Sequence, residues 1–283
     1  MDMSKTPITA EQIAPGYYFD MPENQYRDAE GVNKSYFFEL SKRTGYHLRY
    51  GHGSNFPQAT SDRGRGTHAC VLEDRDIVEM SGFKTRQGAA FKQAHEEAAA
   101  RGKILMPYPE FEDYEGMVAA AKGDWRFQNI MNRPGVNVEV SMFALDPVRD
   151  IRWKGRADVV NLKEGKMYDF KTCADASPDA FMEAVFKYGY DKQAAFYVMI
   201  MRELGVEITQ FNFMCVETKA PYATNLFVMK ADGEVMRAAE IEVNEMLDAA
   251  RDDIFCESPT TGWPTFTEIT LPTGKNPSKN LWT

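Results

Sequence analysis

The stretch on which the fold assignment depends is YDFKT, residues 168–172. If it is a β-strand, its side chains alternate, so Asp169 and Lys171 share one face while Tyr168 and Phe170 share the other. A buried charge is costly unless it is paired or bound to a ligand. The pattern therefore predicts a strand with one packed face and one charged face.

The sequence on both sides of this stretch alternates as further strands and predicts a mixed α/β sheet. Residues 137–144 and 151–160 precede it as two strands joined by turns, so the three strands form a meander. Helices are predicted from Pro178 to Gly189, over residues 190–204 and over residues 233–254, with strands at 208–217 and 223–230 between the last two. Upstream helices are predicted near residues 34–44, 67–74, 89–101 and 113–128.

The composition is that of one globular domain. We expect a single domain over residues 1–283, with a helical part to about residue 130, a catalytic core over about 131–255 and an extended tail over 256–283. Of the 283 residues, 43% are hydrophobic and 27% are charged. No apolar run approaches the roughly 20 residues of a membrane span, and the start lacks a signal peptide, so we expect a cytoplasmic protein without membrane contact.

The cysteines and the net charge exclude some classes of site and weigh against one class of protein. Four cysteines lie far apart without a CxxC pair, which argues against a zinc ribbon, an iron–sulfur cluster or a disulfide scaffold. The net charge of -9 weighs against a passive nucleic-acid coat protein. It leaves open an enzyme that collects its cations in one channel and its carboxylates around a metal.

Carboxylates on adjacent strands suggest a metal site. A turn centred on Glu164 and Gly165 would place Asp158 opposite Lys171, with Asp169 as its diagonal neighbour about 7–8 Å away. The alternative is a cross-strand salt bridge on a solvated face. Two carboxylates beside a lysine suit metal-assisted hydrolysis of a phosphodiester, because the metal activates water and the lysine offsets phosphate charge.

Further residues fit such a site, although each also has a structural explanation. Glu139 on the first strand could add a carboxylate or simply face solvent. Gln193 and Tyr197 share one helix face at i and i+4. His68 could be a metal ligand or a core histidine. Lys84 and Arg86 could bind a phosphate or lie in a solvated loop. Cys173 follows the charged strand but has no histidine or other activating partner nearby, which argues against a role as a nucleophile.

These motifs together resemble the PD-(D/E)XK nuclease superfamily in its RecB-like branch, and more closely the RecE-type exonuclease VIII family. The resemblance rests on the segments GTH (66–68), GRAD (155–158), DFKT (169–172) and QAAFY (193–197) in this order. It also rests on the longer segments KTRQGAAFKQAHEEAAARGK (84–103) and FMCVETKAPY (213–222). It covers roughly residues 33–253, and WPTFTEITLP (263–272) also looks familial.

The resemblance assigns expected roles within the motifs. It implies that Asp158, Asp169, the backbone carbonyl of Phe170 and His68 bind Mg²⁺, with Mn²⁺ as an alternative ion. Lys171 would be the catalytic lysine, and Glu139, Gln193 and Tyr197 would support catalysis. We expect DNA contacts from Arg63, Arg65, Lys84, Arg86 and Arg156. Asp169 replaces the glutamate of much of the superfamily.

The resemblance also implies an activity and partners. It predicts a Mg²⁺-dependent exodeoxyribonuclease that degrades one strand of linear duplex DNA, 5′ to 3′, and leaves 3′ overhangs for a RecT-type annealing protein in recombination. A homotetrameric ring and a phage or prophage origin in a bacterial cell are expected with it. The alternatives are an endonuclease or single-strand nuclease of the same fold, and a catalytically inactive DNA-binding scaffold.

Overall fold

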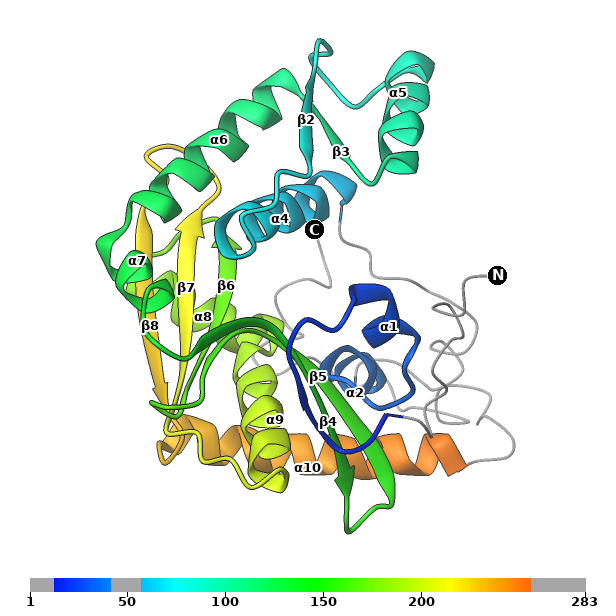
Figure 1. The fold of residues 1–283 in the computed structure, drawn as a ribbon, viewed down its shortest axis with the longest axis vertical. Helices are drawn as coiled ribbons and strands as arrows, with labels where there is room; N and C mark the ends of the chain where they lie inside the picture. Colours follow the sequence, from blue (N-terminus) through cyan, green and yellow to red (C-terminus); the bar gives the residue numbers. More distant parts are fainter. Residues whose placement is uncertain (1–12, 42–56, 256–283) are drawn as a thin grey trace, which may run out of the picture.

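The computed structural model describes residues 13–41 and 57–255 of the 283-residue chain, and its centre is a six-stranded sheet (Figure 1). The strand order is β1-β4-β5-β6-β7-β8, in which β6 and β7 pair in parallel and the other neighbours are antiparallel. The predicted mixed α/β sheet, a three-stranded meander followed by two further strands, is confirmed. Its strands are β1 Gly16–Tyr18, β4 Val136–Asp146, β5 Ile151–Asn161, β6 Lys166–Cys173, β7 Gln210–Glu217 and β8 Thr224–Lys230.

Two helices cross over one face of the sheet between the parallel strands, as a parallel pair requires. These are α8 Pro178–Tyr188 and α9 Tyr190–Glu203. The chain turns between them at Gly189, whose φ of +64° is left-handed and where a Cβ would collide with the ring of Phe38. The interruption predicted from this glycine is confirmed.

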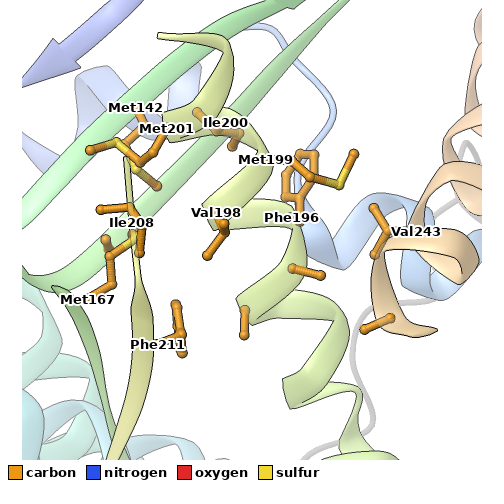
Figure 2. Close-up of a cluster of buried hydrophobic side chains, with 14 of the residues drawn as sticks. Met142, Met167, Phe196, Val198, Met199, Ile200, Met201, Ile208, Phe211 and Val243 are labelled. Carbon is orange, nitrogen blue, oxygen red and sulfur yellow. The ribbon is translucent and has the colours of Figure 1, made fainter. Parts of the chain in front are cut away.

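Helix α9 lies between the sheet and α10 Glu234–Phe255 (Figure 2). In this layer Val198 of α9 lies near Met167 and Phe211 of the strands, and Phe196 and Met199 lie toward Val243 of α10. A helix covered on both sides must be apolar around most of its circumference, which explains why so many of its side chains are buried. The rigid layer holds Gln193, on its first turn, at the edge of the sheet.

The other face of β6 and β7 is covered by α4 Gln58–Leu72, α6 Tyr108–Gly123 and α7 Trp125–Met131. The single helix predicted over residues 113–128 is in fact α6 followed by α7. The break lies at Asp124, which has extended backbone and whose side chain accepts a hydrogen bond from the backbone N–H of Arg126. This N-cap starts a new helix in a different direction.

A small arm extends from this layer. It contains α5 Ala89–Ala100, close to the predicted helix, and the parallel pair β2 Val78–Ser81 and β3 Ile104–Pro107, which the sequence analysis missed. Helix α4 begins nine residues before residue 67, where the sequence predicted its start. The first half was not predicted because its two glycines, Gly64 and Gly66, weaken the helical pattern. Gly66 is required by packing, since a Cβ there would lie 2.5 Å from Val78 Cγ2.

The N-terminal segment of the described chain, residues 13–33, is held against β5 by alternate basic side chains. Arg152 donates to the carbonyl of Ile13, Lys154 to that of Ala29, and Arg156 to that of Met21. This segment includes β1 and α1 Glu23–Asp28, and α2 Lys34–Leu40 follows it. The predicted end of α2 at residue 44 and the predicted tail over 256–283 lie outside the described residues. Over the described ranges, no helix has the length and apolar character needed to cross a membrane.

Candidate active site

The charged residues of the opening stretch face one cleft of about 880 Å³. Asp158 of β5 and Asp169 and Lys171 of β6 line it. Asp169 is 1% exposed and the Lys171 side chain 18% exposed, so both charges are largely withdrawn from water. Tyr168 and Phe170 pack instead into the hydrophobic cluster under α4, α6 and α7. The predicted division into a packed face and a charged face is therefore observed.

The pairing of β5 with β6 differs from the predicted register by two residues. Asn161 pairs with Lys166, and continuing this ladder places Asp158 opposite Asp169. The prediction that Asp158 faces Lys171 is therefore wrong. Because the shift is an even number, each side chain stays on the predicted face, and the composition of the site is unchanged.

The turn itself explains the shift. It spans residues 162–165, two residues more than the predicted turn. The Asn161 side-chain oxygen accepts hydrogen bonds from the backbone N–H groups of Lys163 and Glu164, at 3.1 and 3.2 Å. Gly165 closes the turn at a φ of +61°. An asparagine that caps its own turn in this way favours the longer loop.

Three side chains from different elements converge beside Asp169. His68 of α4 places its Nε2 3.3 Å from Asp158 Oδ2 and 3.4 Å from Glu139 Oε1. One ligand atom from each of these residues lies within 4.8 Å of the others. On the other side of the ring, His68 Nδ1 lies 4.0 Å from Glu73 Oε1. The described chain thus brings one imidazole and two carboxylates to a single point.

Glu139 reaches this point from an unusual backbone conformation. Its φ of +52° is left-handed, inside strand β4, and its side chain pairs with the guanidinium of Arg156. Arg156 also donates to Ser141 Oγ at 2.7 Å. Left-handed backbone is disfavoured for a residue with a Cβ and is common where function needs a particular side-chain direction. The backbone and the arginine together aim the carboxylate into the cleft.

Gln193 of α9 connects the second carboxylate to the lysine. Its Nε2 donates to Asp169 Oδ1 at 2.6 Å, and its Oε1 accepts from Lys171 Nζ at 3.5 Å. The other oxygen of Asp169 pairs with the Lys171 ammonium. Asp169 therefore lies outside the cluster of His68, Glu139 and Asp158, because its carboxylate is held by these two neighbours.

The remaining motif residues line or border the cleft. Tyr197 of α9 lines it, and Gly155 of β5 makes room for the ring, since a Cβ there would lie 3.0 Å from Tyr197 Cε1. The backbone N–H of Phe170 donates to Asp158 Oδ2 at 2.7 Å. A role for the Phe170 carbonyl as a metal ligand stays a prediction.

Mutual charge interactions shift the pKa values of the site. Burial disfavours the charged form of His68, but Asp158 and Glu139 outweigh it and raise the pKa of His68 to about 9. Burial raises the pKa of Asp169 to about 6, although Lys171 opposes this. Burial likewise raises the pKa of Glu139, and the Asp158 charge adds to it. The crowded carboxylates thus favour additional positive charge nearby.

The donor set fits a divalent cation. His68, Glu139 and Asp158 already lie within 4.8 Å of one another, and Asp169 lines the same cleft. Two carboxylates with one imidazole form a mainly hard, oxygen-rich set, which suits Mg²⁺ or Mn²⁺ better than a thiophilic metal. The crowded negative charge would be relieved by such an ion. We therefore describe the cluster as a candidate divalent-metal centre.

The basic residues predicted to contact DNA separate into two groups. Arg65 and Arg156 line the cleft, whereas Lys84 is exposed in the loop before α5. Arg63 is half-buried, and no hydrogen-bond partner of its buried Nε is found among the described residues. Arg86 is ion-paired internally at 17% side-chain exposure. Its donors are engaged by buried Asp62 and by Glu110, and a DNA contact from Arg86 stays a prediction.

Other cleft residues were not anticipated from the sequence. Arg27 and Arg75 line the cleft and pair with Glu23 and Glu73, respectively. Tyr190 also lines it, three residues before Gln193. Arg75 follows the histidine motif closely, which could have drawn attention to it. Arg27 carries no such signal, since only the docking of α1 brings it here.

Comparison with solved structures supports the fold. A protein from Eubacterium rectale named "Putative exonuclease" is 14% identical, with a TM-score of 0.57, over 85% of this chain and 92% of that chain. A phage related exonuclease from Haemophilus somnus 129PT is 12% identical over 75% and 94% of the two chains. Its TM-score is 0.33. No curated protein matches the sequence.

A family comparison covers the small arm and strands β4 to β8 of the sheet. Residues 76–252 match the family described as a PDDEXK-like domain of unknown function, DUF3799. The matched region contains Glu139, Asp158, Asp169 and Lys171, and His68 lies just before it. The fold and the family together support membership of the PD-(D/E)XK nuclease superfamily. Because the match spans more than half of the 283 residues, the chain belongs to the PDDEXK-like family DUF3799.

Proposed function

We propose that this protein is a metal-dependent exodeoxyribonuclease that degrades one strand of linear double-stranded DNA from its end. The observation that carries the proposal is the convergence of an imidazole, three carboxylates and an ammonium group in one cleft. These groups belong to His68, Glu139, Asp158, Asp169 and Lys171. Such a set combines a cation site with a fixed positive charge, which is what hydrolysis of a phosphodiester requires.

His68, Glu139, Asp158 and Asp169 would hold the cation. When bound, a divalent ion supplies a water of lowered pKa and offsets negative charge on the phosphate. Mg²⁺ is the proposed ion and Mn²⁺ the alternative, since both favour oxygen donors. His68, Glu139 and Asp158 then need little movement, because their ligand atoms already lie within 4.8 Å of one another. Asp169 would have to share its carboxylate with Gln193 and Lys171.

Lys171 provides the positive charge for the reacting phosphate. Its ammonium lies beside Asp169 and within 3.5 Å of Gln193 Oε1, so it is directed into the cleft. There it would attract the scissile phosphate and stabilise the additional negative charge of the transition state. Gln193 donates a 2.6 Å hydrogen bond to Asp169 and so keeps this carboxylate beside the Lys171 ammonium.

The finer description rests on the resemblance to the RecE-type family. We propose 5′ to 3′ polarity, production of 3′ overhangs for a RecT-type annealing partner, and action in the cytoplasm of a bacterial cell that carries a phage or prophage. Recombination by strand annealing would use these overhangs. Arg65 and Arg156, which line the cleft, are the residues best placed to contact the DNA backbone.

A homotetrameric ring is part of this proposal. The net charge of -9 means that a monomer should bind DNA weakly at physiological salt. A closed ring would enclose the duplex and bring basic residues from several subunits to one channel. Light scattering should give a tetramer, and digestion should continue after a chase of excess unlabelled duplex. A monomer whose digestion stops on the chase would contradict the ring but leave the catalytic assignment intact.

The central experiment is digestion of a linear duplex labelled separately at each 5′ and 3′ end, with Mg²⁺ or with EDTA. We expect Mg²⁺-dependent release of nucleotides from the 5′ ends and persistence of the 3′-labelled strands. Lys171→Ala should abolish cleavage under steady-state conditions while DNA binding and the circular dichroism spectrum persist, because the charge acts mainly on the chemical step. Wild-type turnover in that variant would refute its role.

Two further substrates separate the alternatives. Covalently closed circular plasmid has no ends, so linearisation of it would indicate an endonuclease. Labelled single-stranded DNA digested in preference to duplex would indicate a single-strand nuclease. Binding of duplex without any cleavage, in Mg²⁺ or Mn²⁺, would favour an inactive scaffold over the proposed enzyme.

A further inference from the structure

Tyr190 contacts Lys171, the central lysine of the candidate site. It is the first residue of α9, directly after the left-handed Gly189, and its half-buried ring lines the cleft. The ammonium of Lys171 lies over this ring, with Nζ 4.8 Å from the centroid. That distance is within the range of a cation–π interaction, in which the negative face of the ring attracts the charge.

The ring is itself held by an aromatic cluster. Its centroid lies 5.7 Å from that of Tyr188, 6.1 Å from that of Phe213 and 6.2 Å from that of Phe181. These rings come from α8 and β7, so two elements besides α9 fix the position of Tyr190. A ring packed in this way loses little freedom when the lysine settles on it, and it therefore makes a preorganised surface.

Lys171 needs such a surface because its other partners have second roles. Its four-carbon side chain has many rotamers, and an ammonium group imposes no fixed direction on its contacts. Asp169, which pairs with it, is also a candidate ligand of the divalent cation. Gln193, its third neighbour, donates to Asp169. The ring of Tyr190 is the neighbour whose hold on the ammonium does not depend on Asp169.

We propose that Tyr190 is a positioning residue for Lys171, and that its ring face, rather than its hydroxyl, keeps the ammonium at the reacting phosphate. This inference rests on the proposed nuclease function. A cation–π contact at a largely desolvated site corresponds to a change in rate of about tenfold. The contribution belongs to the chemical step, so it should appear in kcat and leave KM for DNA unchanged.

The test compares three single variants with wild type under steady-state conditions on linear duplex DNA. Tyr190→Leu removes the ring and should lower kcat about tenfold at unchanged KM. Tyr190→Phe keeps the ring and should retain wild-type kcat within about twofold, which a hydroxyl-based role would not allow. Phe186→Leu is the matched control, because its exposed ring lies on α8 outside the described lining of the cleft, and it should keep wild-type activity.

A double variant separates positioning from general damage to the fold. With enzyme in excess, Lys171→Ala combined with Tyr190→Leu should be no slower than Lys171→Ala alone, because the ring then has no ammonium to hold. A further loss in the double variant, or a Tyr190→Phe enzyme as slow as Tyr190→Leu, would overturn the inference. So would a Tyr190→Leu enzyme with wild-type kcat. A wild-type protein that cleaves no DNA would overturn the proposed function, and this inference with it.

Discussion

Helix α4 carries His68 into the site, and Gly66, one residue before Thr67, sets how closely this helix approaches the small sheet. A Cβ at this position would lie 2.5 Å from Val78 Cγ2, which is 0.9 Å less than the 3.4 Å at which ordinary contact begins. Val78 is buried and β-branched, so its methyl group has little freedom to move away. Gly66→Ala should therefore push α4 and β2 apart.

The expected magnitude follows from two opposing contributions. Overpacking a core by one methyl group destabilises by about 1–3 kcal/mol, and the size of this overlap places it in the upper part, roughly 2–3 kcal/mol. Alanine gains about 1 kcal/mol over glycine in a helix interior. The net loss in unfolding free energy for Gly66→Ala is therefore about 1–2 kcal/mol.

Gly64 of the same helix provides the control. Among the described residues, a Cβ there would meet only Thr172 Oγ1, at an ordinary 3.8 Å. Without a clash, the helix propensity alone should act, and Gly64→Ala should stabilise by about 0.5–1 kcal/mol. The glycine-to-alanine substitution is thus expected to lower the unfolding free energy at residue 66 and to raise it at residue 64 of the same helix.

Urea unfolding of both variants, followed by circular dichroism, measures these differences. A second variant, Val78→Ala, removes the opposing methyl groups. In that background Gly66→Ala should become neutral or stabilising, which is a coupling that a double-mutant cycle detects. If Gly66→Ala proves as stable as Gly64→Ala in the wild-type background, the packing argument for the glycine is refuted.

Four further predictions concern charge. Asp158→Asn and Asp169→Asn should each lose Mg²⁺-dependent cleavage yet remain folded in EDTA; unfolding of both would favour a purely structural salt bridge. The pKa of Asp169 is raised to about 6 in the folded protein, so folding favours its protonated form. The unfolding free energy of the metal-free wild type, relative to that of Asp169→Asn, should therefore fall as the pH rises from about 4 to about 6, measured by urea titration. Asp124→Asn should behave oppositely, because Arg126 and Thr224 overcome burial and hold the pKa of Asp124 at about 2; its loss of about 2 kcal/mol at pH 7 should shrink as pH falls from 4 toward 2. Lys154→Met should destabilise by about 1–3 kcal/mol, since it leaves the carbonyls of Tyr26, Arg27 and Ala29 without their donor. Limited proteolysis should then cut the N-terminal segment faster, and an unchanged digestion pattern would contradict that role.

Local patterns in the sequence were sufficient for the main elements of the core. The three strands of the meander, α8, α9, α10 and strands β7 and β8 were predicted close to their observed bounds. Alternation and helical spacing report which face of an element is buried, and this information lies within a few neighbouring residues. The charged face of β6 was predicted for the same reason.

The weaker local patterns failed where glycines or a cap interrupt them. Gly64 and Gly66 concealed the first half of α4, although packing against Val78 requires the second of them. Asp124 was read as a position within one helix, whereas its side chain starts a second one. At Gly66 the low helix propensity of glycine points away from the helix that packing selects, whereas the preference of Asp124 for an N-cap position was hidden inside a continuous helical pattern.

What the sequence by itself determined is the identity of the chemical groups and the face of each element on which they lie. Tertiary structure decided which groups meet. The turn at Asn161 set the strand register, internal carboxylates engaged Arg86, and the docking of residues 13–33 brought Arg27 to the cleft. The physical reason is that periodicity is a short-range property of the chain. Strand pairing and ion pairing instead join residues far apart in sequence, and their partners are chosen only when the whole core packs.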